Sequence, residues 1–213
     1  MPLGSAAETQ AAAAPRTLRA DAARNRDRLL AAAAAAFAAR GVEAPLEEVA
    51  RSAGVGIGTL YRHFPTRDAL VEAVYRHEVD TLCDGAAELL ATRPADEALS
   101  EWMQRFVGHA AMKRGMATAL KSMMAADAKL FEDCRSRMLE AANSLLAAGV
   151  AAGTVRDDID ALDLLRAVGG VCMSSTDQAD WPQAAQRLVR LLFDGLRKEV
   201  TVDLAKKATR ESM

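Results

Sequence analysis

The chain has 213 residues, of which 51% are hydrophobic and 26% charged, so it can bury a core and is not disordered as a whole. Only 4% are aromatic, while alanine and leucine are abundant; this mixture favours helices, because both side chains lose little freedom in a helix. The formal net charge of −2 argues against a general nucleic-acid coat protein, and no apolar run approaches the ~20 residues that cross a bilayer.

The cysteines and the first residues bear on the cellular compartment. Cys83, Cys134 and Cys172 are far apart and form no CxxC pair, so they indicate neither a zinc site nor a disulfide framework. The opening stretch MPLGSAAETQAAAA carries an acidic residue and lacks the leucine- or valine-rich segment of a signal peptide. We therefore expect a cytoplasmic protein with reduced thiols, no metal site and no cofactor.

Positive charge gathers near the N-terminus. Residues 1–76 hold ten arginines against eight acidic residues, whereas the remainder is net negative. Two stretches are sharply basic, Pro15–Arg28 and Arg51–Arg67, and the second contains no acidic residue. A local basic footprint on a near-neutral protein is expected where one face binds phosphate groups.

The first predicted element is a helix that follows an alanine-rich arm. Residues 1–20 show no amphipathic period and are predicted to be a mobile arm. From Asp21 a helical pattern begins, in which Leu30, Ala34 and Phe37 share one face, and Gly41 ends the helix.

Two short helices and a long one come next. Pro45 opens the segment PLEEVARSA in its first turn, and Gly54 ends it. The segment VGIGTLYRHF forms the second short helix, which Pro65 breaks. Thr66 can then cap a long helix that runs from Arg67 to about residue 91.

The rest of the chain continues with helical patterns alone. They cover residues 95–111, 112–125, 127–152, 160–175 and 182–200, with Asp160 as a cap and breaks at Gly149, Gly153 and Pro182. No stretch alternates with period two, so we predict an all-α protein of about nine helices without a sheet. Its parts are an arm (1–20), a three-helix head (21–66), a larger helical domain (67–200) and a polar tail (201–213).

Residues 46–64 have the pattern of a helix-turn-helix. Val49 and Ala50 point inward from the first short helix, and Gly54 supplies a turn residue with positive φ at little steric cost. Leu60 and Phe64 lie four residues apart on the second helix and can pack back onto the head. The opposite face of that helix stays outside, and the major groove of DNA, about 12 Å wide, admits one helix.

The string RLLAAAAAAFAARGVEAPLEEVARSAGVGIGTLYRHFPTRDALVEAVY resembles the DNA-binding domain of the tetracycline-repressor (TetR) family, most strongly over AGVGIGTLYRHFPTRDAL. The resemblance covers roughly residues 22–75. The segments EWMQRFVGHAAMKRGM and GTVRDDIDALDLL resemble the ligand-binding and dimerisation part of that family, in its SbtR-like subgroup. The resemblance implies a homodimeric regulator that binds double-stranded operator DNA, most often a repressor that a small-molecule effector releases.

Residue roles are implied by the same resemblance. Gly58 and Thr59 would face base edges, while Tyr61, His63 and Arg67 would donate to phosphate oxygens. Tyr61 could instead be a core aromatic, and His63 and Arg67 could be plain surface residues. The predicted DNA-contacting set is Arg28, Gly56, Gly58, Thr59, Tyr61, Arg62, His63 and Arg67.

The chain departs from the family pattern at two places. Ala44-Pro45 stands where the family often has a capping Ser or Thr, and Gly56 stands where many members place Ser or Thr. With Gly56 and Gly58 both lacking side chains, specificity could depend on DNA shape or on backbone N–H groups.

Methionines suggest where an effector binds. Six of the nine lie between Met103 and Met138, and methionine is flexible enough to line an adaptable apolar cavity. The alternative is that these side chains simply fill the core. His109, Arg105 and Asp177 are possible polar anchors that no spacing singles out. The predicted cavity lining is Trp102, Phe106, Met116, Met123, Phe131, Met138 and Met173.

The last two helices have the pattern of an oligomer interface. Two such helices from each of two chains would form a four-helix bundle about a two-fold axis, although the same stripes could also pack within one chain. The predicted interface is Leu162, Leu165, Gly169, Cys172, Leu188, Leu192 and Leu196.

The sequence disfavours two other classes of function. No P-loop, GxSxG, HExxH or dinucleotide-binding glycine pattern is present, so we do not expect an enzyme. A ligand-sequestering protein that kept the fold but lost specific DNA binding is disfavoured by the intact basic face of residues 51–67.

Overall fold

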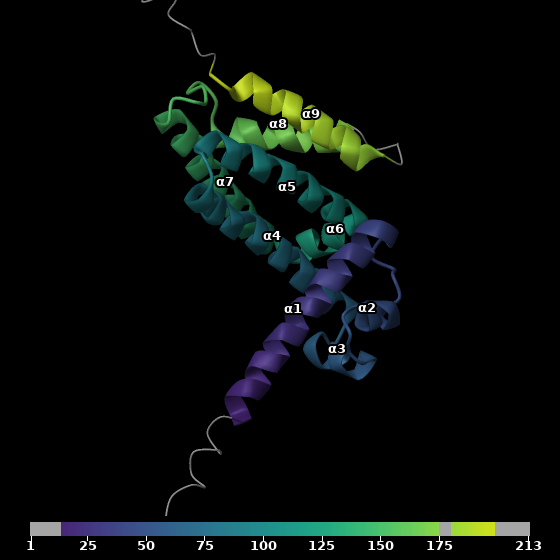
Figure 1. Cartoon of the computed structure of the whole chain (residues 1–213). Coiled ribbons are helices and arrows are strands. Elements are labelled where there is room, and N and C mark those ends of the chain that lie inside the picture. Colours follow the sequence, from purple (N-terminus) through teal and green to yellow (C-terminus); the bar gives the residue numbers. More distant parts are fainter. Residues whose placement is uncertain (1–13, 175–179, 199–213) are drawn as a thin grey trace, which may run out of the picture. The chain divides into compact units, whose positions relative to one another are not determined.

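The computed structural model describes residues 14–174 and 180–198, with side chains from residue 20 onward. The rest of the arm, Asp177 and the tail therefore lie outside the described residues. The fold is all-α, as the sequence predicted: the described residues form nine helices and no named strand (Figure 1). The helices are α1 (Ala14–Arg40), α2 (Leu46–Ser52), α3 (Ile57–His63), α4 (Arg67–Thr92), α5 (Ala95–Gly115), α6 (Ala117–Ala126), α7 (Ala128–Ala151), α8 (Ala161–Ser174) and α9 (Trp181–Leu196). Across these ranges, no helix is long and apolar enough to span a membrane.

The chain divides into two compact units. Unit 1 comprises residues 1–83 and 108–138, and unit 2 comprises residues 84–107 and 139–213. The helices α4, α5 and α7 each contribute residues to both units. The boundary therefore cuts through long helices, whereas the sequence pattern placed a domain boundary after residue 66.

Several predicted helix ends are confirmed by their local geometry. The Thr66 hydroxyl accepts a hydrogen bond from the backbone N–H of Ala69 at 3.1 Å, and thereby caps α4. Asp160 caps α8 in the same way, at 2.7 Å from the N–H of Asp163. Gly41 follows α1 with φ +79°, the left-handed backbone that glycine adopts most easily.

Three boundaries differ from the sequence-based expectation. The helix α1 begins at Ala14 rather than Asp21. Alanine and arginine favour helix without an amphipathic stripe, and Pro15 in the first turn lacks only an N–H that would be unpaired there. Pro45 is the N-cap of α2 rather than its first residue. The break between α5 and α6 lies at Met116, beyond the expected position near residue 111.

The core of unit 1 joins the head to the neighbouring helices. Phe37, Val49, Leu60 and Phe64 belong to one buried cluster, as the helix-turn-helix pattern required. The cluster continues through α4, α5, α6 and α7 with the buried residues Leu70, Val71, Val74, Tyr75, Val79, Met112, Met116, Leu120, Leu130 and Cys134.

In unit 2, α8 and α9 pack side by side (Figure 1). Their buried faces carry Ala161, Leu164, Val168 and Cys172 on α8 and Ala185, Val189, Phe193 and Leu196 on α9. An isolated antiparallel bridge joins Val155 to Arg197, and the N–H of Arg156 donates to the carbonyl of Leu196 at 3.0 Å. The turn after α7 is thus tied to the end of α9.

Candidate nucleic-acid interface and effector-binding core

The turn between α2 and α3 has the geometry of a helix-turn-helix. Gly54 adopts φ +69°, so a residue with a Cβ would be strained there. The N–H of Val55 donates to the carbonyl of Ala50 at 3.0 Å, and Ala53 is buried beneath the turn. The half-buried Val55 packs against the core. These contacts fix the angle at which α3 leaves the turn.

The helix α3 presents a polar face to solvent. Leu60 is fully buried, and the helix therefore has a fixed inner side. Tyr61 is 46% exposed and Arg62 is also exposed, whereas Thr59 and His63 are half-buried. Tyr61 is thus not a core aromatic, and its hydroxyl is available to a partner.

Gly56 and Gly58 are open positions. Gly56 is the N-cap of α3 with φ −75°, so its backbone does not require glycine. A Cβ at either position would meet no atom within 4 Å in the part of the chain that the structure describes. Packing within the chain therefore does not explain the two glycines, which leave the start of α3 free for close approach by another molecule.

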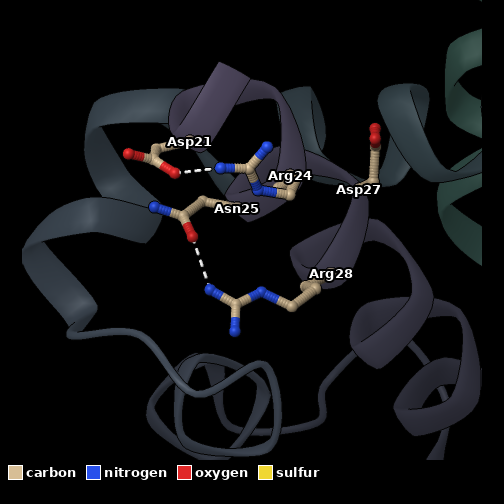
Figure 2. A pocket seen from close by; sticks show the side chains of 5 residues that line it. All are labelled: Asp21, Arg24, Asn25, Asp27 and Arg28. Carbon is tan, nitrogen blue, oxygen red and sulfur yellow. Dashed lines mark hydrogen bonds and ion pairs between the residues drawn. The ribbon is translucent and has the colours of Figure 1, made fainter. Parts of the chain in front are cut away.

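The N-terminal part of α1 carries a surface hollow of about 690 Å³. Figure 2 shows that Arg24 forms an ion pair with Asp21, while the guanidinium of Arg28 donates to the side-chain oxygen of Asn25. Asp27 points away from both arginines (Figure 2). Arg28 is exposed and bonded to a neutral amide, so its charge is available to a phosphate.

Arg67 has a structural role that the sequence did not indicate. Its Nη1 donates to the backbone carbonyls of Val42 and Ala44, the latter at 2.8 Å. The half-buried guanidinium thus ties the start of α4 to the loop between α1 and α2. Both N–H groups of Nη1 are used in these bonds, so only the N–H groups of Nε and Nη2 remain to bind a phosphate.

Aromatic and titratable groups meet in the part of unit 1 beyond the head. The ring of Tyr75 lies 5.1 Å from that of Phe131 and 6.2 Å from that of His109, centroid to centroid. Burial lowers the pKa of His109 to about 4, with a further lowering by the charge of Lys113. Burial also raises the pKa of Tyr75, so both rings are neutral near pH 7.

The predicted effector-binding residues divide between the two units. Met116 is buried in the core of unit 1, and Met123, Phe131 and Met138 pack against that core. In unit 2, Trp102 is buried and its ring centroid lies 6.0 Å from that of Phe106. Also in unit 2, Met173 is 76% exposed, so within the described chain its side chain lines no cavity.

The predicted interface residues also fall into two groups. Cys172 and Leu196 are buried inside unit 2, so their side chains face their own chain rather than solvent. Leu162, Leu165, Gly169 and Leu192 are half-buried, and Leu188 is 41% exposed.

The structure also shows three candidate residues that the sequence patterns did not identify. Leu191, 68% exposed on α9, lies beside the predicted stripe but outside it. Arg26 lies with its Cζ 5.7 Å from the centroid of the Phe64 ring, a contact across many residues that no local pattern reveals. Tyr75 follows Val74 on the apolar face of α4 and could have been found from that helical spacing.

Comparisons with known proteins decide the family. A sequence profile described as "Bacterial regulatory proteins, tetR family" matches residues 29–74, and one described as "Transcriptional regulator SbtR-like, C-terminal domain" matches residues 94–198. A TetR transcriptional regulator from Streptomyces coelicolor is 45% identical, with a TM-score of 0.76 over 82% of this chain and 99% of that one. The chain belongs to the TetR family.

Two further relatives agree with this assignment. A TetR transcription regulatory protein from Mycobacterium vanbaalenii is 40% identical, with a TM-score of 0.67 over 85% of this chain and 99% of that one. The HTH-type transcriptional repressor KstR2 of Mycolicibacterium smegmatis is 33% identical over 144 residues, which cover 63% of this chain and 69% of the relative. As a TetR-family protein, the chain is a DNA-binding transcriptional regulator, and its relatives are regulators rather than enzymes.

Proposed function

We propose that this regulator is a cytoplasmic homodimeric repressor that leaves a pseudo-palindromic operator when an apolar small molecule binds. The observation that carries the proposal is the outer face of α3, where exposed Tyr61 and Arg62 follow the open glycines at the start of the helix. The relative KstR2 is a transcriptional repressor, which supports repression over activation.

The contacts with DNA follow from that face. Tyr61, Arg62 and His63 would donate to phosphate oxygens, while Thr59 and the backbone at Gly56 and Gly58 would approach base edges. Glycines offer no side chain for hydrogen bonds to bases, so the sequence preference of α3 would depend strongly on groove shape. Phosphate contacts set affinity, whereas base contacts set sequence preference.

A two-fold dimer would place two such helices in successive major grooves, about 34–36 Å apart. The surface that supports a dimer is the outer face of α8 and α9. It carries half-exposed leucines on both helices together with Gly169 and Gly195, at which a Cβ would meet no atom of the described residues within 4 Å. An exposed apolar face of this kind marks a protein interface in a soluble domain.

The effector would bind among the partly buried side chains of unit 1. Met123, Phe131 and Met138 are only partly buried and can rearrange, and the neutral rings of Tyr75 and His109 lie nearby. This apolar lining suits an apolar ligand with one or two polar groups. A ligand that prefers one arrangement of the core would shift DNA affinity by linkage, typically 5–150-fold.

The first experiment captures genomic DNA fragments with the purified protein and sequences those that bind. We expect an inverted repeat whose half-sites are one helical turn apart or a multiple of it. Tyr61→Phe should weaken binding to all fragments, because it removes only a phosphate donor, whereas Thr59→Ala should change the preferred sequence. Binding without any shared repeat would contradict the operator proposal.

The effector proposal is tested with a compound that releases the captured DNA, found by screening apolar small molecules. Met138→Trp fills space in the core of unit 1 and should reduce the response. Phe106→Trp makes a comparable change at the half-buried lining residue predicted in unit 2, and a response reduced there but not in Met138→Trp would place the effector beside Trp102 instead. If both variants respond like the wild type, the effector binds elsewhere.

A further inference from the structure

Two arginines of α1 reach opposite ends of α3. The Nη1 of Arg28 lies 3.6 Å from the point that a Cβ on Gly54 would occupy, in the turn before α3. The Cζ of Arg26 lies 5.7 Å from the ring centroid of Phe64, the residue that follows α3. One helix therefore delivers a guanidinium to each end of the helix that we expect in the major groove.

Both guanidinium groups keep their charge available. Arg26 and Arg28 are exposed, and neither forms an ion pair within the described part of the chain. Arg28 donates to the neutral amide of Asn25, and Arg26 lies near an aromatic ring. A guanidinium held against a ring face has its N–H donors free at its edge, where they can bind a phosphate. Arg24, by contrast, already forms an ion pair with Asp21.

The dimensions suit the major groove. A helix with its side chains is about 10–12 Å across, close to the groove width of about 12 Å. A helix in the groove therefore runs between two phosphate-lined walls, and phosphates flank it at both of its ends. We propose that Arg26 and Arg28 form an arginine bracket, in which each binds a phosphate beside one end of α3.

The bracket deepens the proposed DNA-binding function and rests on it. Sequence reasoning named Arg28 as a flanking contact, but it did not name Arg26 or relate either residue to the ends of α3. The match to the family profile begins at residue 29, so both arginines lie outside the segment that the profile describes.

The test measures how DNA affinity changes with salt concentration on a mixed-sequence duplex, because phosphate contacts do not depend on sequence. Each phosphate contact contributes about 0.9 to the slope of log K against log salt. Arg26→Gln and Arg28→Gln should each reduce the slope by about 0.9 per protomer, and about 1.8 in a dimer. Arg26→Lys keeps a cation at this position and should retain most of the slope.

Arg24→Gln is the matched control, since it removes the same charge from the same helix at a residue already paired with an acid. Its slope should equal that of the wild type, and circular dichroism should show every variant to be folded. If Arg24→Gln lowers the slope as much as Arg26→Gln, or if neither bracket variant lowers it, the bracket is wrong. A wild type without salt-dependent binding would overturn the DNA-binding proposal itself.

Discussion

At the scale of single residues, Arg67 shows how one side chain can serve the fold at a position where family resemblance suggests a contact with DNA. Its Nη1 donates to two carbonyls of the loop before α2, at Val42 and Ala44. Hydrogen bonds from a charged donor stabilise a fold by about 1.5–3 kcal/mol each. The loop that positions α2 therefore depends on a residue of α4.

This clamp predicts a loss of stability from Arg67→Ala. We expect the free energy of unfolding to fall by about 2 kcal/mol or more, because two half-buried carbonyls lose a charged donor. Urea unfolding measures this change, and a salt titration on duplex DNA separates it from a phosphate role. A variant with wild-type stability and a slope lower by about 0.9 per protomer would show that Arg67 acts on DNA instead.

His109 predicts a dependence of stability on pH. Its pKa in the folded protein is about 4, below the ordinary value of 6.5, because burial and Lys113 disfavour the charged ring. As the pH falls through 6.5, the ring of His109 is therefore protonated in the unfolded chain but not in the folded protein. Protonation stabilises the unfolded chain, so the free energy of unfolding decreases until the folded protein is protonated too, at about pH 4. From pH 7.5 to pH 5 this group alone should lower the free energy of unfolding by about 2 kcal/mol.

His109→Gln, which cannot titrate, should lose that part of the pH dependence in urea unfolding curves. An NMR titration of the His109 ring should place its midpoint near 4. A midpoint near 6.5 would show that the ring is hydrated and charged more easily than its burial implies.

At the scale of elements, the end of α5 touches the backbone of α1. A Cβ on Gly115 would lie 2.0 Å from the carbonyl oxygen of Phe37 and 2.7 Å from its carbonyl carbon. No side chain can relieve such a clash, since the atoms it meets are backbone. The close approach holds the break before α6 against the last turn of α1, within unit 1.

Gly115→Ala should therefore destabilise the protein by about 1–3 kcal/mol, the usual cost of overpacking. Gly108→Ala on the same helix is the control, because a Cβ there would meet none of the described residues within 4 Å. It should raise stability by about 0.5–1 kcal/mol, since alanine favours helix over glycine. Thermal unfolding of the two variants compares them directly, and a neutral Gly115→Ala would mean that α1 and α5 can separate at little cost.

Periodicity found the helices but could not locate every boundary between them. The break at Met116 was placed too early because Met112, Met116 and Leu120 continue one apolar stripe across it. The start of α1 was missed because its first turns carry no stripe at all. Capping residues such as Thr66 and Asp160 act within a few residues, so local reasoning identified them correctly.

The candidate site was predictable only where local pattern determines it. The residues of the helix-turn-helix follow an ordered string, which is why their helices and turn could be named in advance. On α8, by contrast, Leu164 and Leu165 belong to adjacent stripes, and either stripe could face the chain's own core. Tertiary packing decides between them and turns Cys172 inward. Contacts across the chain, such as Arg26 with Phe64, leave no local signature.

At the scale of the whole molecule, the outer face of α8 and α9 predicts the state of assembly. Leu191 is 68% exposed and Leu188 is 41% exposed, so a monomer leaves the apolar surface of both side chains in water. A second copy that covered this surface would stabilise the dimer by burying it. Leu191→Glu should preserve the fold, because the side chain lies outside the core, yet it would bury a carboxylate at the two-fold interface. We therefore expect sedimentation velocity to show a folded monomer at micromolar concentration, where we expect the wild type to be a dimer.

The loss of the dimer should appear in DNA binding as well. A monomer contacts one half-site, so its salt slope on duplex DNA should be about half that of the wild type. Met124→Glu is the matched control: Met124 is 47% exposed on α6, outside the proposed interface, and its variant should remain dimeric with an unchanged slope. If Leu191→Glu also stays dimeric, the chains associate through another surface, and the four-helix bundle of α8 and α9 is wrong.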